Sequence, residues 1–160
     1  MNFKNIFTEI NKLHGIFLVK LIEKNDGVRI LICGSKETNE KFTLDEFSNN
    51  QEIYEIISEG TVILEDLSVI YEIYFEDYIA YQITKETLSN VQDDIEKYDA
   101  GVYFRIYNKS SYMNYVIRNS IADACFQGEY VHYEICTEWQ IIDIISPVEP
   151  RIIIHKQDEC

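Results

Sequence analysis

The spacing of apolar side chains changes several times along the chain, and each change marks an expected element. Apolar residues three and four positions apart predict an amphipathic helix over residues 3–14. Two apolar, β-rich runs follow at residues 16–23 and 28–33, on either side of a turn that contains Asp26 and Gly27. Asp-Gly between hydrophobic runs is a strong hairpin signal, because glycine and its neighbour tolerate positive φ. We therefore predict a hairpin in the interior of a sheet, with both faces covered.

The middle of the chain combines loop, helix and strand signals. Residues 34–41 are polar and predict a loop. Residues 43–46 have the form of a capping box, which marks the start of a helix that continues toward residue 57. Two runs of period 2 then lie at residues 69–75 and 78–84. Because only a short acidic link separates these runs, we predict a second hairpin with one face in water.

The last third of the chain alternates between helix and strand patterns. Ser110 is a good N-cap for the clearest helix of the chain, and Gly128 is suited to end it. The predicted elements are a helix over residues 90–98, a strand over 102–107, a helix over 110–128, and strands over 130–136, 139–145 and 152–155.

Runs of strands interrupted by isolated helices are typical of an α+β fold. We expect a mainly antiparallel sheet of about six to eight strands, with three or four helices packed against it. The chain has 160 residues, of which 46% are hydrophobic, which is enough for one core. We therefore predict a single domain over residues 1–156 and a flexible C-terminal tail over residues 157–160.

The net charge of −14 is concentrated in the middle of the chain. Residues 35–100 contain seventeen acidic and four basic residues. Such a field repels phosphate backbones and anionic lipid headgroups, so we expect no direct binding to nucleic acid or to a membrane. It attracts cationic surfaces, and a basic protein is therefore the expected partner. The alternative is that the acidity serves solubility alone.

Tyrosines are interleaved with the acids of this middle region. A tyrosine brings a large, stiff contact area and a hydroxyl group, which suits a binding surface. Two adjacent acids of the set also fit the first turn of a helix, where they would serve the helix dipole instead. The predicted partner-binding residues are Glu72, Tyr74, Glu76, Asp77, Tyr78, Asp93, Asp94 and Glu96.

The sequence contains no GxSxG, HExxH, P-loop or GxGxxG motif. Strand alternation places His132, Glu134 and Cys136 on one face, and Asp143 or His155 could join them in binding a metal. Zinc sites use three or four convergent ligands, and only His132 and Glu134 are local. We expect no metal, no cofactor and no enzymatic activity. The alternative is a small-molecule-binding or enzymatic domain with a pocket near His132 and Glu134.

The four cysteines show no CxxC spacing, and the N-terminal stretch lacks the charged-then-apolar design of a signal peptide. No apolar run approaches the ~20 residues that span a bilayer. These features predict a cytoplasmic protein whose thiols stay reduced.

The most concrete hypothesis is a small inhibitor that binds and neutralises a basic protein. In its acidity and tyrosine content the chain is similar to bacterial immunity proteins that block basic nuclease toxins, although no family motif carries this likeness. Its carboxylates would cover the nucleic-acid site of the toxin. A further alternative is a structural subunit of a homo-oligomer, with the apolar strand at residues 139–145 as the contact edge.

Overall fold

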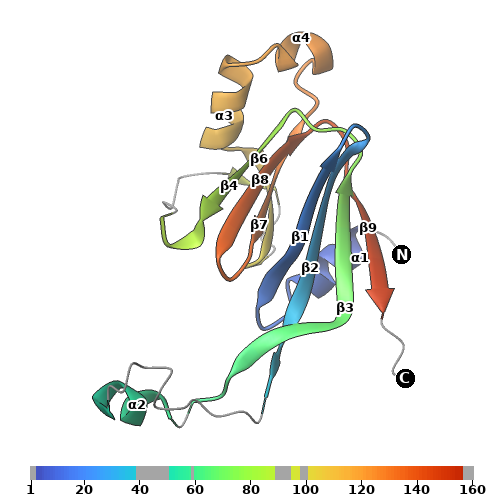
Figure 1. Ribbon diagram of the computed structural model, residues 1–160. Helices are drawn as coiled ribbons and strands as arrows, with labels where there is room; N and C mark the ends of the chain where they lie inside the picture. The colour runs from blue at the N-terminus through green and yellow to red at the C-terminus, as the bar shows by residue number, and fades with distance from the viewer. Residues whose placement is uncertain (1–2, 39–50, 59, 89–94, 98–100, 157–160) are drawn as a thin grey trace.

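The computed structural model describes residues 3–38, 51–58, 60–88, 95–97 and 101–156 (Figure 1). The strands are β1 (Ile16–Lys24), β2 (Gly27–Glu37), β3 (Ile63–Phe75), β4 (Ala80–Lys85), β5 (Ile95–Glu96), β6 (Phe104–Lys109), β7 (Val131–Cys136), β8 (Gln140–Ser146) and β9 (Arg151–Lys156). The helices are α1 (Phe3–Ile10), α2 (Gln51–Ile57), α3 (Ser111–Arg118) and α4 (Ala122–Phe126), with a short 3₁₀ helix, η2 (Glu86–Leu88).

The strands form two antiparallel sheets, which confirms the predicted α+β fold. One sheet has four strands in the order β1-β2-β3-β9, and the other has five in the order β4-β8-β7-β6-β5. All neighbouring strands are antiparallel. The strands thus divide between two sheets instead of forming the one sheet that the alternating runs suggested.

The first predicted hairpin is present. β1 pairs with β2 up to Lys24 opposite Gly27, which leaves a two-residue turn. Gly27 has φ +126°, and a Cβ there would lie 2.1 Å from the carbonyl oxygen of Phe75, so only glycine fits. The predicted burial of both strands was wrong for β1, because β1 is the outer strand of its sheet, and Lys20 and Glu23 are exposed.

The second predicted hairpin was wrong. β3 pairs with β2 and β9, whereas β4 pairs with β8 in the other sheet. The link between β3 and β4 therefore crosses from one sheet to the other. Alternation identifies each run as a strand, but it does not choose the strand with which that run pairs.

Two other elements differ from the predictions, and a third can be compared only in part. β2 continues to Glu37 through the expected loop, because backbone pairing with β3 does not require apolar side chains. Residues 43–46, the predicted capping box, lie outside the described residues, and α2 accounts for the last part of that predicted helix. Ile95 and Glu96 pair with β6 as β5, where a helix was expected.

The predicted helix over residues 110–128 is divided into α3 and α4. Ser110 caps α3 as predicted, and its hydroxyl accepts a hydrogen bond from the Met113 N–H at 2.9 Å. After α3, the Asn119 amide donates to the Tyr115 carbonyl at 2.8 Å. The Ser120 hydroxyl accepts from the Ala122 N–H at 3.2 Å. These side chains compete with the helical backbone bonds and end the first helix early.

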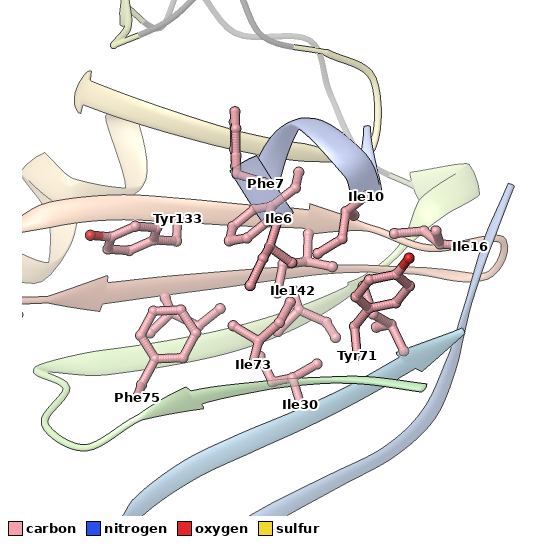
Figure 2. Close-up of a cluster of buried hydrophobic side chains, with 14 of the residues drawn as sticks. Ile6, Phe7, Ile10, Ile16, Ile30, Tyr71, Ile73, Phe75, Tyr133 and Ile142 are labelled. Carbon is pink, nitrogen blue, oxygen red and sulfur yellow. The ribbon is translucent and has the colours of Figure 1, made fainter. Parts of the chain in front are cut away.

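The main core lies between the two sheets and α1. Figure 2 shows the side chains of Ile6, Phe7 and Ile10 of α1 in one cluster with Ile73 and Ile142 of the strands. All five side chains are buried. A smaller cluster on the other face of the five-stranded sheet contains Met113 and Val116 of α3 together with Ile145 of β8. The second cluster places α3 over the face of β7 that carries His132.

Candidate functional site

An open pocket lies where β1 and β3 end. The turn between β1 and β2 forms one side, and the link between β3 and β4 forms the other. The pocket has a volume of about 480 Å³. Its lining residues are Glu23, Lys24, Asn25, Gly27, Glu76, Asp77 and Tyr78. Three of these, Glu76, Asp77 and Tyr78, were predicted from the sequence as partner-binding residues, and we call this site the acidic pocket.

Within the acidic pocket, the Glu23 carboxylate accepts hydrogen bonds from two tyrosines. The Tyr78 hydroxyl donates to its Oε1 at 2.7 Å, and the Tyr81 hydroxyl donates to its Oε2 at 2.8 Å. The two tyrosine rings meet edge to face, with centroids 5.6 Å apart. These bonds join β1 in one sheet to the start of β4 in the other. Sequence reasoning missed Glu23, because nothing local to β1 indicates that two tyrosines about 55 residues later will reach it.

The hydrogen bonds fix the charge of the Glu23 carboxylate. The donation from Tyr78, and then that from Tyr81, holds the pKa of the Glu23 carboxyl below its ordinary value. The bond to Glu23 in turn raises the pKa of Tyr78 to about 12. At neutral pH the pocket therefore contains an ionised carboxylate held in one orientation by neutral phenols.

Glu76 and Asp77 supply the exposed charge of the acidic pocket. Glu76 Oε2 lies 3.1 Å from Arg151 Nη2, and both side chains are about two-thirds exposed, so water weakens this ion pair. The Asp77 side chain is exposed. Its carbonyl oxygen accepts a hydrogen bond from the Ser146 hydroxyl at 2.6 Å, which anchors the link to β8. The backbone is thus held while both carboxylates face solvent.

Tyr74 is not an exposed residue, and this corrects the prediction. Only 7% of its surface is accessible. The guanidinium carbons of Arg29 and Arg151 lie 4.0 Å and 5.0 Å from the centre of its ring. Its hydroxyl donates to the Asp26 carbonyl at 2.5 Å. Two arginines from the neighbouring strands β2 and β9 therefore cover the ring, which belongs to the structure of the sheet.

Glu72 is also engaged within the sheet. It lies 3.4 Å from Arg29 Nε and 2.7 Å from His155 Nε2, and its side chain is 16% exposed. The three strands that carry these residues are neighbours, so the contacts cross the sheet face. Glu96 lies in β5, and its side chain is not described. The remaining two predicted acids, Asp93 and Asp94, lie outside the described residues.

A second polar group lies on the outer face of the five-stranded sheet. His132 Nε2 lies 2.9 Å from Asp143 Oδ1, and the amide of Gln82 donates to Asp143 Oδ2 at 3.0 Å. The His132 ring is 2% exposed and stacks on Tyr107 with centroids 4.9 Å apart. Within the described chain, His132 Nδ1 is the buried side-chain nitrogen that makes no hydrogen bond.

Glu134 neighbours this pair and accepts three hydrogen bonds at its Oε1. It accepts from Arg105 at 3.1 Å, from the Tyr107 hydroxyl at 3.0 Å and from the Cys136 thiol at 3.4 Å. Burial, with the charge of Glu134, raises the pKa of Cys136 to about 12. Burial also raises the pKa of Tyr107. The Cys136 thiol therefore stays protonated and unreactive. Hydrogen bonds to Glu134 join Arg105, Tyr107 and Cys136 in one polar network.

Only part of the metal-binding set considered from the sequence comes together, because His132 meets Asp143. His155 lies in β9 beside Glu72, in the other sheet from His132. Among the described residues, no three His, Cys, Asp or Glu side chains converge as metal ligands would. In the same part of the chain, no helix has the length and apolarity needed to cross a bilayer.

The two polar sites differ in exposure. Glu23, Glu76 and Asp77 line an open pocket, whereas His132 and Asp143 are buried. Comparisons of this chain with protein families, with curated proteins and with solved structures find no match.

Proposed function

We propose that this protein binds a basic protein partner through the acidic pocket and neutralises it, as an immunity-type inhibitor of a nuclease toxin would. The observation that supports this proposal is the convergence of three carboxylates, from Glu23, Glu76 and Asp77, on one pocket of about 480 Å³. Only Lys24 opposes them among the lining residues. The pocket therefore has a net negative charge and enough room for a long cationic side chain.

The chemistry of the acidic pocket suits arginine in particular. A guanidinium group presents several donors in a fixed plane and pairs with carboxylates in a bidentate manner. Glu23 is already oriented by Tyr78 and Tyr81, so binding does not have to order it. The Tyr78 ring, which is half-buried, adds an aromatic surface beside the carboxylates.

The overall charge supports a role in rapid association. A net charge of −14 attracts a cationic protein over long range and raises the association rate. The nucleic-acid site of a nuclease is rich in Lys and Arg, because it must bind phosphates. Carboxylates placed on that site would compete directly with the phosphates of the substrate. Inhibition then requires only tight binding and no reaction.

The test compares two double variants with equal changes in charge. Glu76→Gln/Asp77→Asn removes charge from the acidic pocket, and Glu86→Gln/Glu129→Gln removes it from exposed positions elsewhere. A partner captured from the native cell is bound to a biosensor, and association is measured at two salt concentrations. We expect the pocket variant to associate about tenfold more slowly, with a flatter salt dependence. The control variant should stay within about twofold of the wild type.

The same partner is assayed for nuclease activity with and without the protein. Inhibition by the wild type that is weakened in the pocket variant supports the proposal. Equal effects of the two double variants would show that the acidity acts only through net charge. A captured partner that is acidic would reject the proposal outright.

A further inference from the structure

A second surface lies at the opposite end of β3 from the acidic pocket. There β2 and β3 continue as a two-stranded ribbon, which pairs Gly34–Glu37 with Ile63–Asp66. β1 pairs with β2 only as far as Gly34, and β9 pairs with β3 only from Val69 onward. Figure 1 shows the ribbon projecting away from both sheets, with α2 at its far end. We call this ribbon, with Leu67 and α2, the arm.

A bulge directs the arm away from the sheet. Cys33 is opposite Ile70, but the next residue, Gly34, is opposite Asp66, so residues 67–69 of β3 have no counterpart on β2. Asp66 Oδ1 accepts a hydrogen bond from the Ser68 N–H at 3.1 Å, which holds the irregular turn. Bulges of this kind bend a strand and increase its twist. The direction of the arm is therefore set by the bulge and its hydrogen bond.

Aliphatic side chains of the arm are exposed to solvent. Ile56 is 80% exposed, Ile63 58%, Leu64 41% and Leu67 40%. Ile63 and Leu64 are consecutive in a strand, so they point to opposite faces of the ribbon. A two-stranded ribbon is marginally stable in water, and aliphatic side chains exposed on both of its faces favour contact with another molecule. Both faces of the arm thus favour being covered by another molecule.

The charges of the arm indicate what kind of partner would cover it. Its described residues contain five acids, Glu37, Glu52, Glu55, Glu65 and Asp66, against the single base Lys36. A second copy of this chain carries a net charge of −14 and would bring like charges together. A partner surface with an apolar groove and a basic rim complements both the aliphatic side chains and the carboxylates.

We propose that the arm inserts into an apolar groove with a basic rim on a partner protein, at a site separate from the acidic pocket. Ile63 and Leu64 fill the groove from the two faces of the ribbon, and Glu37 and Glu65 pair with the rim. This inference does not depend on the function of the acidic pocket, because the two surfaces lie at opposite ends of β3.

The test uses the full chain and two synthetic peptides as probes. One peptide alternates leucine with lysine, and the other alternates leucine with glutamate. Binding is measured by fluorescence anisotropy, and amide hydrogen exchange locates the protected residues. We expect the lysine peptide to bind and to protect residues 34–37 and 63–67. Its affinity should fall at least about tenfold in Ile63→Ser/Leu64→Ser and stay within about twofold in Glu86→Gln/Glu129→Gln, which removes two charges away from the arm.

A charge-reversed variant keeps the test decisive if the serine variant does not fold. Glu37→Lys/Glu65→Lys keeps the aliphatic side chains, and it should lose the lysine peptide and gain binding to the glutamate peptide. Protection at residues 76–77 in place of the arm would overturn the proposal. So would equal binding by the serine variant. Sedimentation that shows a dimer of the free protein, abolished by the serine substitutions, would assign the arm to a second copy and also reject the proposal.

Discussion

Asn11 hydrogen-bonds both backbone polar groups of Phe104. Its Nδ2 donates to the Phe104 carbonyl at 2.9 Å, and its Oδ1 accepts from the Phe104 N–H at 2.9 Å. The same side chain donates to the Phe7 carbonyl and accepts from the Tyr103 N–H, each at 3.1 Å. One amide thus ties the end of α1 to the first residue of β6. The Asn11 side chain also leaves no room for a side chain at position 101, because a Cβ on Gly101 would lie 2.5 Å from Asn11 Cγ.

We predict that Asn11→Ala lowers the free energy of unfolding by about 3 kcal/mol, because two backbone groups of β6 lose their partner in a poorly hydrated place. Denaturant unfolding followed by circular dichroism measures this change. Asn119→Ala is the matched control, since Asn119 is exposed and bonds only within its own helix end; its cost should stay near about 0.5 kcal/mol. Equal costs at the two sites would contradict the bridging role of Asn11.

Tyr74→Ala should destabilise the protein by about 3 kcal/mol or more, because it leaves a cavity between two arginines in the middle of the sheet. Tyr74→Phe keeps the ring and should cost only about 1 kcal/mol, for the lost bond to the Asp26 carbonyl. Thermal and denaturant melts compare the two. Tyr115→Ala, at a tyrosine that is 64% exposed, is the control and should leave the melt nearly unchanged. A stable Tyr74→Ala protein would return this ring to the candidate binding residues.

His132 and Asp143 should be strongly coupled in stability. Removing either partner leaves the other buried without its main contact, so His132→Ala and Asp143→Ala should each cost about 3 kcal/mol. In a double-mutant cycle, the double variant should lose at least about 1 kcal/mol less than the two single losses combined. Additive losses would show that the 2.9 Å contact contributes little.

The pKa of Glu23 should depend on its two tyrosine donors. Its depressed pKa stabilises the folded state at pH values above the pKa of the unfolded chain, and this contribution is lost as the pH falls through the folded pKa. Glu23→Gln should therefore flatten the fall of the melting temperature on acidification from about pH 5 to about pH 3. In carboxyl NMR titrations, Tyr78→Phe should raise the Glu23 pKa, and more than Tyr81→Phe does. An unchanged Glu23 pKa in both variants would disprove the hydrogen-bonded arrangement.

The sequence located most strands correctly, but of the two hairpins that it predicted only the pairing of β1 with β2 is present. The runs at residues 16–33 and 130–155 appear at nearly the predicted positions, since alternation and turn residues are local signals. β3 and β4 looked like a hairpin because only four residues separate them, yet they belong to different sheets. β9 pairs with β3 from about 80 positions further along the chain, and β8 pairs with β4 from about 60 positions further along, where no local pattern points to them.

The candidate site shows the same division. Glu76, Asp77 and Tyr78 were found from composition, because acids and tyrosine in a link between strands are visible in the sequence. Tyr74 was assigned to the correct strand but was wrongly predicted to be exposed to solvent. Arg29 and Arg151, on neighbouring strands, cover its ring. Glu23 was missed for the same reason. Charge density is a local property, whereas burial depends on pairing across the sheet.

The pairing of β3 with β9 has a consequence for biosynthesis. β1, β2 and β3 leave the ribosome early and can assemble at once, but β9 consists of residues 151–156. Until these residues emerge, the backbone groups of β3 at residues 69–74 form an open edge on the nascent chain. Such an edge can pair with other unfinished chains, and sheets closed by distant segments form slowly. Pairing with β9 therefore covers this edge and ends its exposure to other chains.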